Sequence, residues 1–240
     1  MELRLATVPA LSSVPGLVHG FGQKDGPKPE TREEARVRVG AALKGAGRLL
    51  LMRQVHGTTI MTAPWEGAPE ADAAVATDPG LLVGVATADC LPVLLVDPGR
   101  RAVAAVHAGW RGTAAQIAVR AVEALVAAGS HPGDLLAALG PAIGPCCYEV
   151  GDEVRSAFGP GAGPSFRPGP RGRPHLDVRG ANESQLEGAG LQSERIHRVE
   201  DCTSCRRDLY HSYRRDGAGT GRMISFVGFG AEGQGLHFAS

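Results

Sequence analysis

Three residues that could bind one metal ion follow apolar segments of the chain: His56 in RQVHG, Cys90 in TADCLP and His107 in AAVHAGWRG. Each lies where an expected strand gives way to a glycine or proline turn, and strand ends are where α/β folds assemble their sites. Taken singly, a His or a Cys is more often structural. Together, two imidazoles and one thiolate suit zinc, which keeps a fourth position open when it is catalytic. The three residues therefore define a candidate zinc centre, with copper as the alternative metal for the same ligands.

The composition describes an ordinary folded protein without a net charge. The 240 residues are 43% hydrophobic, and 25 Lys and Arg balance 25 Asp and Glu. The totals give no reason to expect binding to nucleic acid or to a membrane, so any anionic ligand must be held locally. The N-terminus lacks a basic segment followed by an apolar core, and the chain contains no apolar run of about eighteen residues. We expect a cytoplasmic protein that is a monomer or a small homo-oligomer.

Short apolar runs alternate with amphipathic segments along the chain, which predicts one mixed α/β domain over residues 1–240. The expected strands are 49–55, 58–62, 81–87, 92–96, 102–106, 135–139, 195–199 and 223–229. Several are continuous apolar runs, which is typical of strands buried on both faces. The expected helices are 30–43, 113–128, 150–158 and 178–189, the second with Thr113 as its N-cap and Gly129 as its stop. Residues 159–174, dense in Gly, Pro and Arg, are predicted to form a mobile surface loop or lid.

Five blocks of the sequence, in this order, resemble the polyphenol oxidase or laccase-domain family of YfiH type: RQVHG, TADCLPVLL, AAVHAGWRGT, GPAIGPCCYEVGDEV and SYRRDGAGTGR. The resemblance extends over nearly the whole chain and implies a single-domain mixed α/β layered sandwich. It also implies that His56, Cys90 and His107 bind zinc. The implied reactions are phosphorolysis of adenosine, inosine, guanosine and S-methyl-5'-thioadenosine to free base and (methylthio)ribose 1-phosphate, and hydrolytic deamination of adenosine to inosine.

Metal chemistry agrees with part of what the resemblance implies. A multicopper laccase needs a blue-copper site and a three-copper cluster, and hence many imidazoles in paired HxH patterns. This chain has eight His and no HxH. Zinc lowers the pKa of bound water, which could then attack adenine at its amino-bearing carbon. Phosphorolysis instead requires an anion clamp and protonation of the leaving purine.

Residues near the three ligands could supply that clamp and that proton. The expected catalytic residues are Asp89, as an acid, base or ligand-orienting group, and Arg111 and Arg53, as parts of a phosphate clamp. The expected substrate-binding residues are Gly109, Trp110, Arg214 and Arg215. Backbone amides of 109–113 could bind phosphate, and the indole could stack on a purine. Each has a structural alternative, because an Asp can cap a turn, a Trp can pack among glycines and an Arg can be solvated surface.

The four other cysteines suggest further thiol chemistry. An odd total of five argues against a complete disulfide framework and favours thiol reactivity or metal binding. Cys146 and Cys147 in GPCCYEV are interpreted as buried structural thiols before a helix. Cys202 and Cys205 form a CxxC that could be a redox pair or a second metal clip, and an intracellular disulfide is a further alternative.

Three other classes of function stay open. Cys90 and His107 could form the nucleophile and base of a cysteine hydrolase or deamidase, in which case the thiolate would not be a metal ligand. Alternatively, the centre could stabilise a module that binds a purine or a protein partner, which a fourth protein ligand such as Cys147 would favour, since structural zinc has four. Multicopper polyphenol oxidase chemistry is the third alternative.

Overall fold

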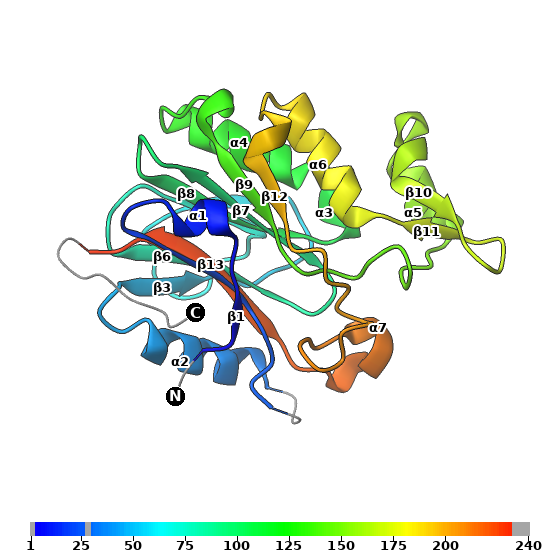
Figure 1. Ribbon diagram of the computed structural model, residues 1–240, viewed down its shortest axis with the longest axis horizontal. Coiled ribbons are helices and arrows are strands. Elements are labelled where there is room, and N and C mark those ends of the chain that lie inside the picture. The colour runs from blue at the N-terminus through cyan, green and yellow to red at the C-terminus, as the bar shows by residue number, and fades with distance from the viewer. Residues whose placement is uncertain (1–2, 27–29, 232–240) are drawn as a thin grey trace.

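The computed structural model describes residues 3–26 and 30–231 of the chain. Two β-sheets are stacked face to face, and helices cover the outer face of each (Figure 1). Helix α2 (Arg32–Ala42) lies on the first sheet, while α4 (Ile117–Ala127) and α6 (Val178–Gly188) lie on the second. The mixed α/β layered sandwich that the sequence predicts is therefore confirmed.

The first sheet has five strands and is antiparallel except where β3 pairs with β6. In spatial order its strands are β1 (Leu5–Ala6), β2 (Leu17–Gly22), β13 (Met223–Phe229), β6 (Leu81–Thr87) and β3 (Arg48–Leu51). Strands β6 and β13 have the bounds that the sequence predicts.

The second sheet has six strands, with antiparallel pairing in the middle and a parallel pair at each edge. In spatial order its strands are β12 (Ile196–Arg198), β9 (Leu136–Leu139), β7 (Leu91–Asp97), β8 (Ala102–Ala108), β5 (Ala73–Ala76) and β4 (Ile60–Thr62). A separate hairpin joins β10 (Phe166–Pro168) to β11 (Pro174–Leu176).

The remaining helices are short and lie mainly in the connections between strands. They are α1 (Pro9–Ser12), α3 (Trp110–Ala114), α5 (Asp152–Ala157) and α7 (Tyr213–Asp216), with 3-10 turns η1 (Pro132–Asp134), η2 (Pro160–Ser165), η3 (Ser193–Arg195) and η4 (Gly217–Gly219). Helix α2 begins with a capping box, in which Thr31 and Glu34 bond to each other's backbone amides.

Alternating side chains of the central strands pack into different apolar layers. In β6, Val83 and Val85 face the layer between the sheets, where Leu94 and Val227 also lie. Leu82 faces the opposite way, into the layer beneath α2. Because both faces of these strands are covered, most positions along them are apolar, which explains why their sequence shows no regular alternation with polar residues.

Two predicted elements are wrong in their details. The predicted helix 113–128 is two helices, α3 and α4, because Gln116 adopts a left-handed backbone with φ of 60°. Thr113 is not an N-cap: it lies inside α3, where its hydroxyl accepts a hydrogen bond of 2.9 Å from Asn182. The predicted loop 159–174 contains η2 and β10, whose pairing with β11 makes much of it regular structure.

One end of the two sheets gathers the strand ends that build the site. Thr87, the last residue of β6, lies opposite Met223, the first residue of β13. In the other sheet, Leu91 at the start of β7 lies opposite Ala108 at the end of β8. Within the described ranges, no helix is long and apolar enough to cross a membrane.

Candidate active site

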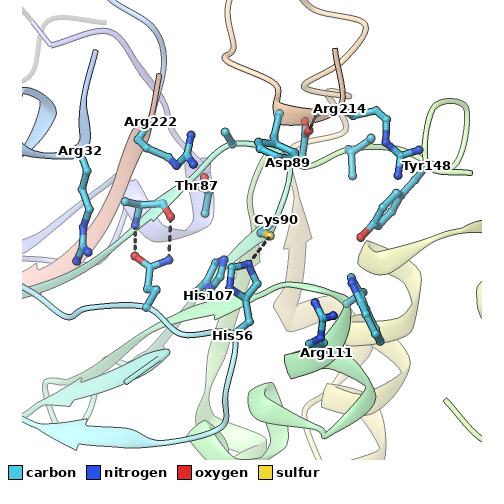
Figure 2. Close-up of a pocket in the computed structure, with 16 residues that line it drawn as sticks. Arg32, His56, Thr87, Asp89, Cys90, His107, Arg111, Tyr148, Arg214 and Arg222 are labelled. Carbon is cyan, nitrogen blue, oxygen red and sulfur yellow. Dashed lines mark hydrogen bonds between the residues drawn. The ribbon is translucent and has the colours of Figure 1, made fainter. Parts of the chain in front are cut away.

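Two loops and the end of strand β8 bring His56, Cys90 and His107 into one cluster, which we call the pocket centre. Their ligand atoms all lie within 4.8 Å of one another, and Cys90 Sγ is 4.0 Å from His56 Nε2 (Figure 2). The two imidazole rings meet edge to face with centroids 4.8 Å apart. Zinc binds nitrogen at about 2.0 Å and sulfur at about 2.3 Å, so small side-chain movements would close the three donors on one ion.

Asp72, which directly precedes β5, positions both histidines. Its carboxylate is fully buried and accepts hydrogen bonds from the backbone N–H groups of Val55, His56 and Gly57 at 3.1, 2.9 and 2.7 Å. The same carboxylate lies 2.8 Å from His107 Nδ1, which leaves Nε2 of that ring for the cluster. A carboxylate behind a metal-binding imidazole fixes its tautomer and orientation. Asp72 therefore links the loop of one histidine to the side chain of the other.

The backbone at His56 is strained, and its surroundings hold it in place. Its φ of 60° falls in the left-handed region, which a residue with a Cβ adopts at a cost of about 1–2 kcal/mol. The strained turn directs three successive amides at one carboxylate, a concave arrangement that binds anions. Just before it, the amide side chain of Gln54 donates to the carbonyl of Ala86 and accepts from its N–H, at 2.8 and 2.9 Å. This pair ties the turn to the end of β6.

Gly109 and Asp89 shape the turns beside Cys90. A Cβ at Gly109 would stand 3.1 Å from both Cys90 Sγ and a ring carbon of His56, so any larger residue would crowd these two side chains. Asp89 also has a left-handed backbone, with φ of 86°. Its carboxylate accepts bonds from Thr203 Oγ1, Ser212 Oγ and the N–H of Arg214 at 2.6, 3.0 and 2.7 Å. Thr203 lies in the loop after β12, and Ser212 and Arg214 lie at the start of α7.

Buried charges shift the protonation of the pocket centre. Burial disfavours the Cys90 thiolate, but His107 and His56 outweigh this and lower the pKa of the thiol to about 6. Burial likewise disfavours the His107 imidazolium, but Cys90 and Asp72 outweigh it and raise its pKa to about 9. For Asp72, hydrogen bonds from His107 and from backbone amides overcome burial and lower the pKa. Without a metal, the cluster therefore holds a thiolate beside an imidazolium at neutral pH.

A pocket of about 610 Å³ contains the pocket centre, a volume in the range of small-molecule sites. Four guanidinium groups line it: Arg32 and Arg222 lie to one side of the ligands, and Arg111 and Arg214 to the other (Figure 2). The other lining residues are Gln54, Ala86, Thr87, Ala88, Asp89, Trp110, Ile143, Tyr148 and Tyr213. The pocket thus combines cationic and aromatic walls, which suits an anion together with a flat ring.

The predicted site residues divide between the pocket and its surroundings. Trp110 and Arg111 line the pocket, and the guanidinium of Arg111 lies 4.2 Å from the centroid of the indole. Arg214 lines it too, but its guanidinium donates to the carbonyl of Glu149 at 2.8 Å. The structure places Arg53 outside this lining, exposed and paired with Glu70.

Arg215 and Cys147 also lie away from the pocket centre. The guanidinium of Arg215 donates to the carbonyls of Thr203 and Ser204 at 3.0 and 3.1 Å, and it is not part of the pocket lining. Cys147 Sγ lies 3.4 Å from Cys205 Sγ, within a separate group of four cysteines. It is therefore not a fourth ligand of the pocket centre.

Sequence reasoning missed several residues of the site. Asp72 precedes a short alanine-rich strand that was not expected, and its position opposite His107 follows only from the pairing of β5 with β8. Arg32 and Arg222 lie at the first turn of α2 and just before β13, far apart in the sequence. Tyr148 follows the paired cysteines in GPCCYEV. The sequence could show only that each of these polar residues lies next to an expected strand or helix. It does not show which ends of those elements lie together in the fold.

Known proteins resemble this chain in sequence and in fold. The family model described as multi-copper polyphenol oxidoreductase laccase matches residues 14–230. A Deinococcus radiodurans protein named purine nucleoside phosphorylase is 41% identical over 207 residues, covering 86% of this chain and 79% of that protein. A protein of an unknown prokaryotic organism, named adenosine deaminase RL5, is 39% identical over 160 residues, covering 65% of this chain and 61% of that protein. The crystal structure of YlmD from Geobacillus stearothermophilus has a TM-score of 0.83 and 32% identity, covering 91% of this chain and 93% of that one.

Proposed function

The chain belongs to the multi-copper polyphenol oxidoreductase laccase family, and on that premise we propose that it is a zinc-dependent enzyme of purine nucleosides. The proposed reactions are phosphorolysis of adenosine, inosine, guanosine and S-methyl-5'-thioadenosine, and hydrolytic deamination of adenosine. Relatives named purine nucleoside phosphorylase and adenosine deaminase support both types of reaction. The observation that carries the proposal is the pocket centre itself: three metal-binding side chains, open on one side, in a pocket with four arginines.

The donor set of the pocket centre fits zinc. Two imidazoles and one thiolate are ligands that zinc accepts, and three protein ligands leave a position for water or substrate. The carboxylate of Asp72 behind His107 is the kind of partner that orients a metal-binding histidine. Bound there, zinc would supply Lewis acidity and lower the pKa of water, which is the chemistry that deamination of adenine requires.

The arginines of the pocket support an anionic co-substrate. Among the described residues no carboxylate pairs with the guanidinium of Arg111, which rests on the face of Trp110 and stays available to a phosphate oxygen. Arg32 and Arg222 extend the positive lining on the opposite side of the ligands. Guanidinium groups bind phosphate through paired N–H donors. We assign the phosphate to the Arg111 side, because the aromatic residues that would hold the purine lie beside it.

Aromatic side chains of the pocket would hold the purine and offer it a proton. Trp110 presents an indole ring, and Tyr148 directs its phenol into the pocket from the side of Arg214 (Figure 2). Burial raises the pKa of the Tyr148 phenol well above its ordinary value, so the O–H is retained across the neutral range. A neutral phenol can donate a hydrogen bond to a nitrogen of the leaving purine. Asp89, whose carboxylate already accepts three bonds, is assigned a positioning role beside Cys90.

Copper oxidase chemistry finds less support in the arrangement of side chains. In the described part of the chain, two groups of side chains could hold a metal, one with two imidazoles and one with four thiols. A three-copper cluster next to a blue-copper site needs many more imidazoles than either group offers. We therefore assign the chain to this family without assigning it the copper-dependent oxidation that the family's description names.

One observation favours a second candidate, a cysteine hydrolase or deamidase. The shifted pKa values of Cys90 and His107 describe a thiolate–imidazolium pair, which is the resting state of many cysteine nucleophiles. The second imidazole at 4.0 Å from the sulfur favours metal binding over this alternative, because a nucleophile needs only one base. Metal content separates the two, since a coordinated thiolate is not free to attack a substrate.

The proposed function is tested by measuring two products in parallel. Zinc-loaded protein is incubated with inosine and with adenosine, with and without phosphate, and free base and ammonia are quantified. We expect free base to form from both nucleosides only when phosphate is present, and ammonia to form from adenosine with or without it. Absence of both products would overturn the proposal. Turnover that survives full removal of the metal, but not alkylation of Cys90, would favour the cysteine hydrolase.

A further inference from the structure

Two pairs of cysteines that are far apart in the sequence form a second cluster, which we call the four-cysteine cluster: Cys146, Cys147, Cys202 and Cys205. Their four sulfurs all lie within 4.8 Å of one another. Cys205 Sγ is 3.6 Å from Cys146 Sγ and 3.4 Å from Cys147 Sγ. The cluster is separate from the pocket centre, because none of these residues lines that pocket.

We propose that the four-cysteine cluster binds one zinc ion as a closed, structural site. Four sulfurs at about 2.3 Å from a tetrahedral zinc stand about 3.8 Å apart, close to the spacing found here. A cluster of several irons with bridging sulfides would need its cysteine sulfurs farther apart. Four thiolates leave no position for substrate, so this zinc would hold the chain together and not take part in turnover.

The backbone around the sulfurs is built for such a site. The N–H of Gly144 donates to Cys202 Sγ at 3.2 Å, the kind of bond that supports a metal-bound thiolate. A Cβ at Gly144 would stand 3.3 Å from Cys146 Sγ and 3.5 Å from Cys202 Sγ, so this glycine lets the backbone approach the sulfurs. The carbonyl of the same residue accepts the N–H of Cys147 at 2.9 Å, which forms the turn that carries the paired cysteines.

Two arginines support the backbone of the CxxC, and each is also paired with a carboxylate, Arg179 with Glu200 and Arg215 with Asp216. Arg179 is buried and donates to the carbonyl of Asp201, the residue before Cys202, at 3.0 Å. Arg215 donates to the carbonyls of Thr203 and Ser204, which separate the two cysteines of the CxxC. Two arginines therefore hold the backbone in place just before and within the CxxC.

The location of the cluster indicates what the zinc would stabilise. Its two halves follow β9 and β12, which are parallel neighbours, and the bridge between Ala142 and Cys202 continues their pairing. Thr203, inside the CxxC, donates to Asp89 beside the pocket centre at 2.6 Å. Tyr148, one residue after the paired cysteines, lines the pocket. The zinc would thus fix two loops that form one wall of the pocket, without contacting its ligands.

The test counts zinc in reduced protein purified without chelators. We expect two zinc ions per chain in the wild type, one in Cys205→Ser and one in Cys90→Ala. The matched control is Ser204→Ala, which lies between the two CxxC cysteines and removes no thiol, and it should keep two. Because a closed zinc site contributes folding energy directly, Cys205→Ser should also lower the melting temperature by about 5 °C or more. The same zinc content in the wild type and in Cys205→Ser would overturn the proposal, as would one iron per chain at the cluster.

A cobalt experiment keeps the inference testable if Cys205→Ser fails to fold. Cys90→Ala protein is stripped of metal, reduced and titrated with Co²⁺ alone. We expect one equivalent to give the visible bands of tetrahedral cobalt and the near-ultraviolet sulfur-to-metal charge transfer of four thiolates, and to protect all four cysteines from alkylation. Weak octahedral bands, or an intact mass showing disulfides in the protein as isolated from reducing conditions, would contradict the assignment. None of these readouts depends on the reaction proposed for the pocket.

Discussion

The pocket centre and the four-cysteine cluster lie near the same end of the sheets, yet their surroundings differ. The pocket centre has three side chains that could bind a metal, opens into a pocket of about 610 Å³ and faces four arginines. The four-cysteine cluster has four, and its neighbours hold the backbone of the loops that carry it. The number of ligands and the groups around them therefore separate a site that can bind substrate from one that can only bind metal. Residue types alone would not separate them, because both contain cysteine.

The largest expected effect is loss of the pocket centre through Cys90→Ala. Removing one of three ligands should abolish zinc binding in the pocket and lower turnover by more than about 100-fold, beyond what loss of an outer partner costs. Turnover and zinc content are measured on the same preparation. If the two sites differ as described, the melting temperature should change less than in Cys205→Ser. Full activity in Cys90→Ala would show that the pocket centre is not where the chemistry occurs.

The next effect is expected from Asp72→Asn. The substitution keeps the volume but removes the charge that faces His107 and the amides of the His56 turn, so pocket zinc affinity or turnover should fall about 10- to 100-fold. Zinc affinity is measured by competition with a chelating dye. Asp78→Asn is the matched control, since that aspartate is exposed, and it should behave as wild type. Equal losses in both variants would contradict the positioning role of Asp72.

A smaller effect is expected at the anion clamp. Arg111→Ala should raise the KM for phosphate about 10-fold, the range for loss of a charged hydrogen bond, and should change ammonia release from adenosine less. Arg53→Ala is the control, because its exposed side chain pairs with Glu70 outside the pocket lining, and it should change either rate less than about twofold. A larger rise in the phosphate KM of Arg53→Ala than of Arg111→Ala would contradict the assignment of phosphate binding to Arg111.

The pH dependence of thiol alkylation gives the smallest effect and compares both clusters in one sample. In metal-free protein the pKa of Cys90 is lowered to about 6, so half of the Cys90 side chains are thiolates at pH 6. Its alkylation rate should therefore rise only about twofold from pH 6 to pH 8, against roughly 80-fold for an ordinary thiol of pKa about 8.5. Hydrogen bonding with Cys147 raises the pKa of Cys205 to about 11, so that residue should stay slow at pH 8. Peptide mass spectrometry resolves the sites, and a steep rise at Cys90 would refute the ion pair.

Part of this fold could be predicted from the sequence because its physical cause is local. Strands β6 and β13 are continuous apolar runs, and their bounds were predicted correctly because both faces of each strand are buried. Strand β5 was missed, since four residues of the sequence AAVA carry little β-propensity. The break at Gln116 was missed as well, because a left-handed residue within an apolar helical pattern leaves no signal in the periodicity.

The candidate sites depend even more than the strands on contacts that a single sequence does not show. The ligand types of the pocket centre were visible in the sequence, and the ordered motifs named the three residues. The partner of His107 was not visible, because Asp72 reaches it only through the pairing of β5 with β8. The four-cysteine cluster was seen only as two pairs, since Cys147 and Cys205 are 58 residues apart and meet through the parallel pairing of β9 with β12. Long-range strand pairing decides which residues meet, and one sequence does not reveal it.

The most direct test of the proposed division between the two sites is zinc-dependent turnover of inosine. Wild-type protein is stripped of metal and reduced, and zinc is then added stepwise while phosphate-dependent release of hypoxanthine is followed. The stripped protein is expected to be inactive, and activity should return only as zinc fills the pocket centre, with no recovery in Cys90→Ala at any zinc concentration. Release of hypoxanthine by the metal-free protein, or its recovery in the Cys90→Ala variant, would contradict the account.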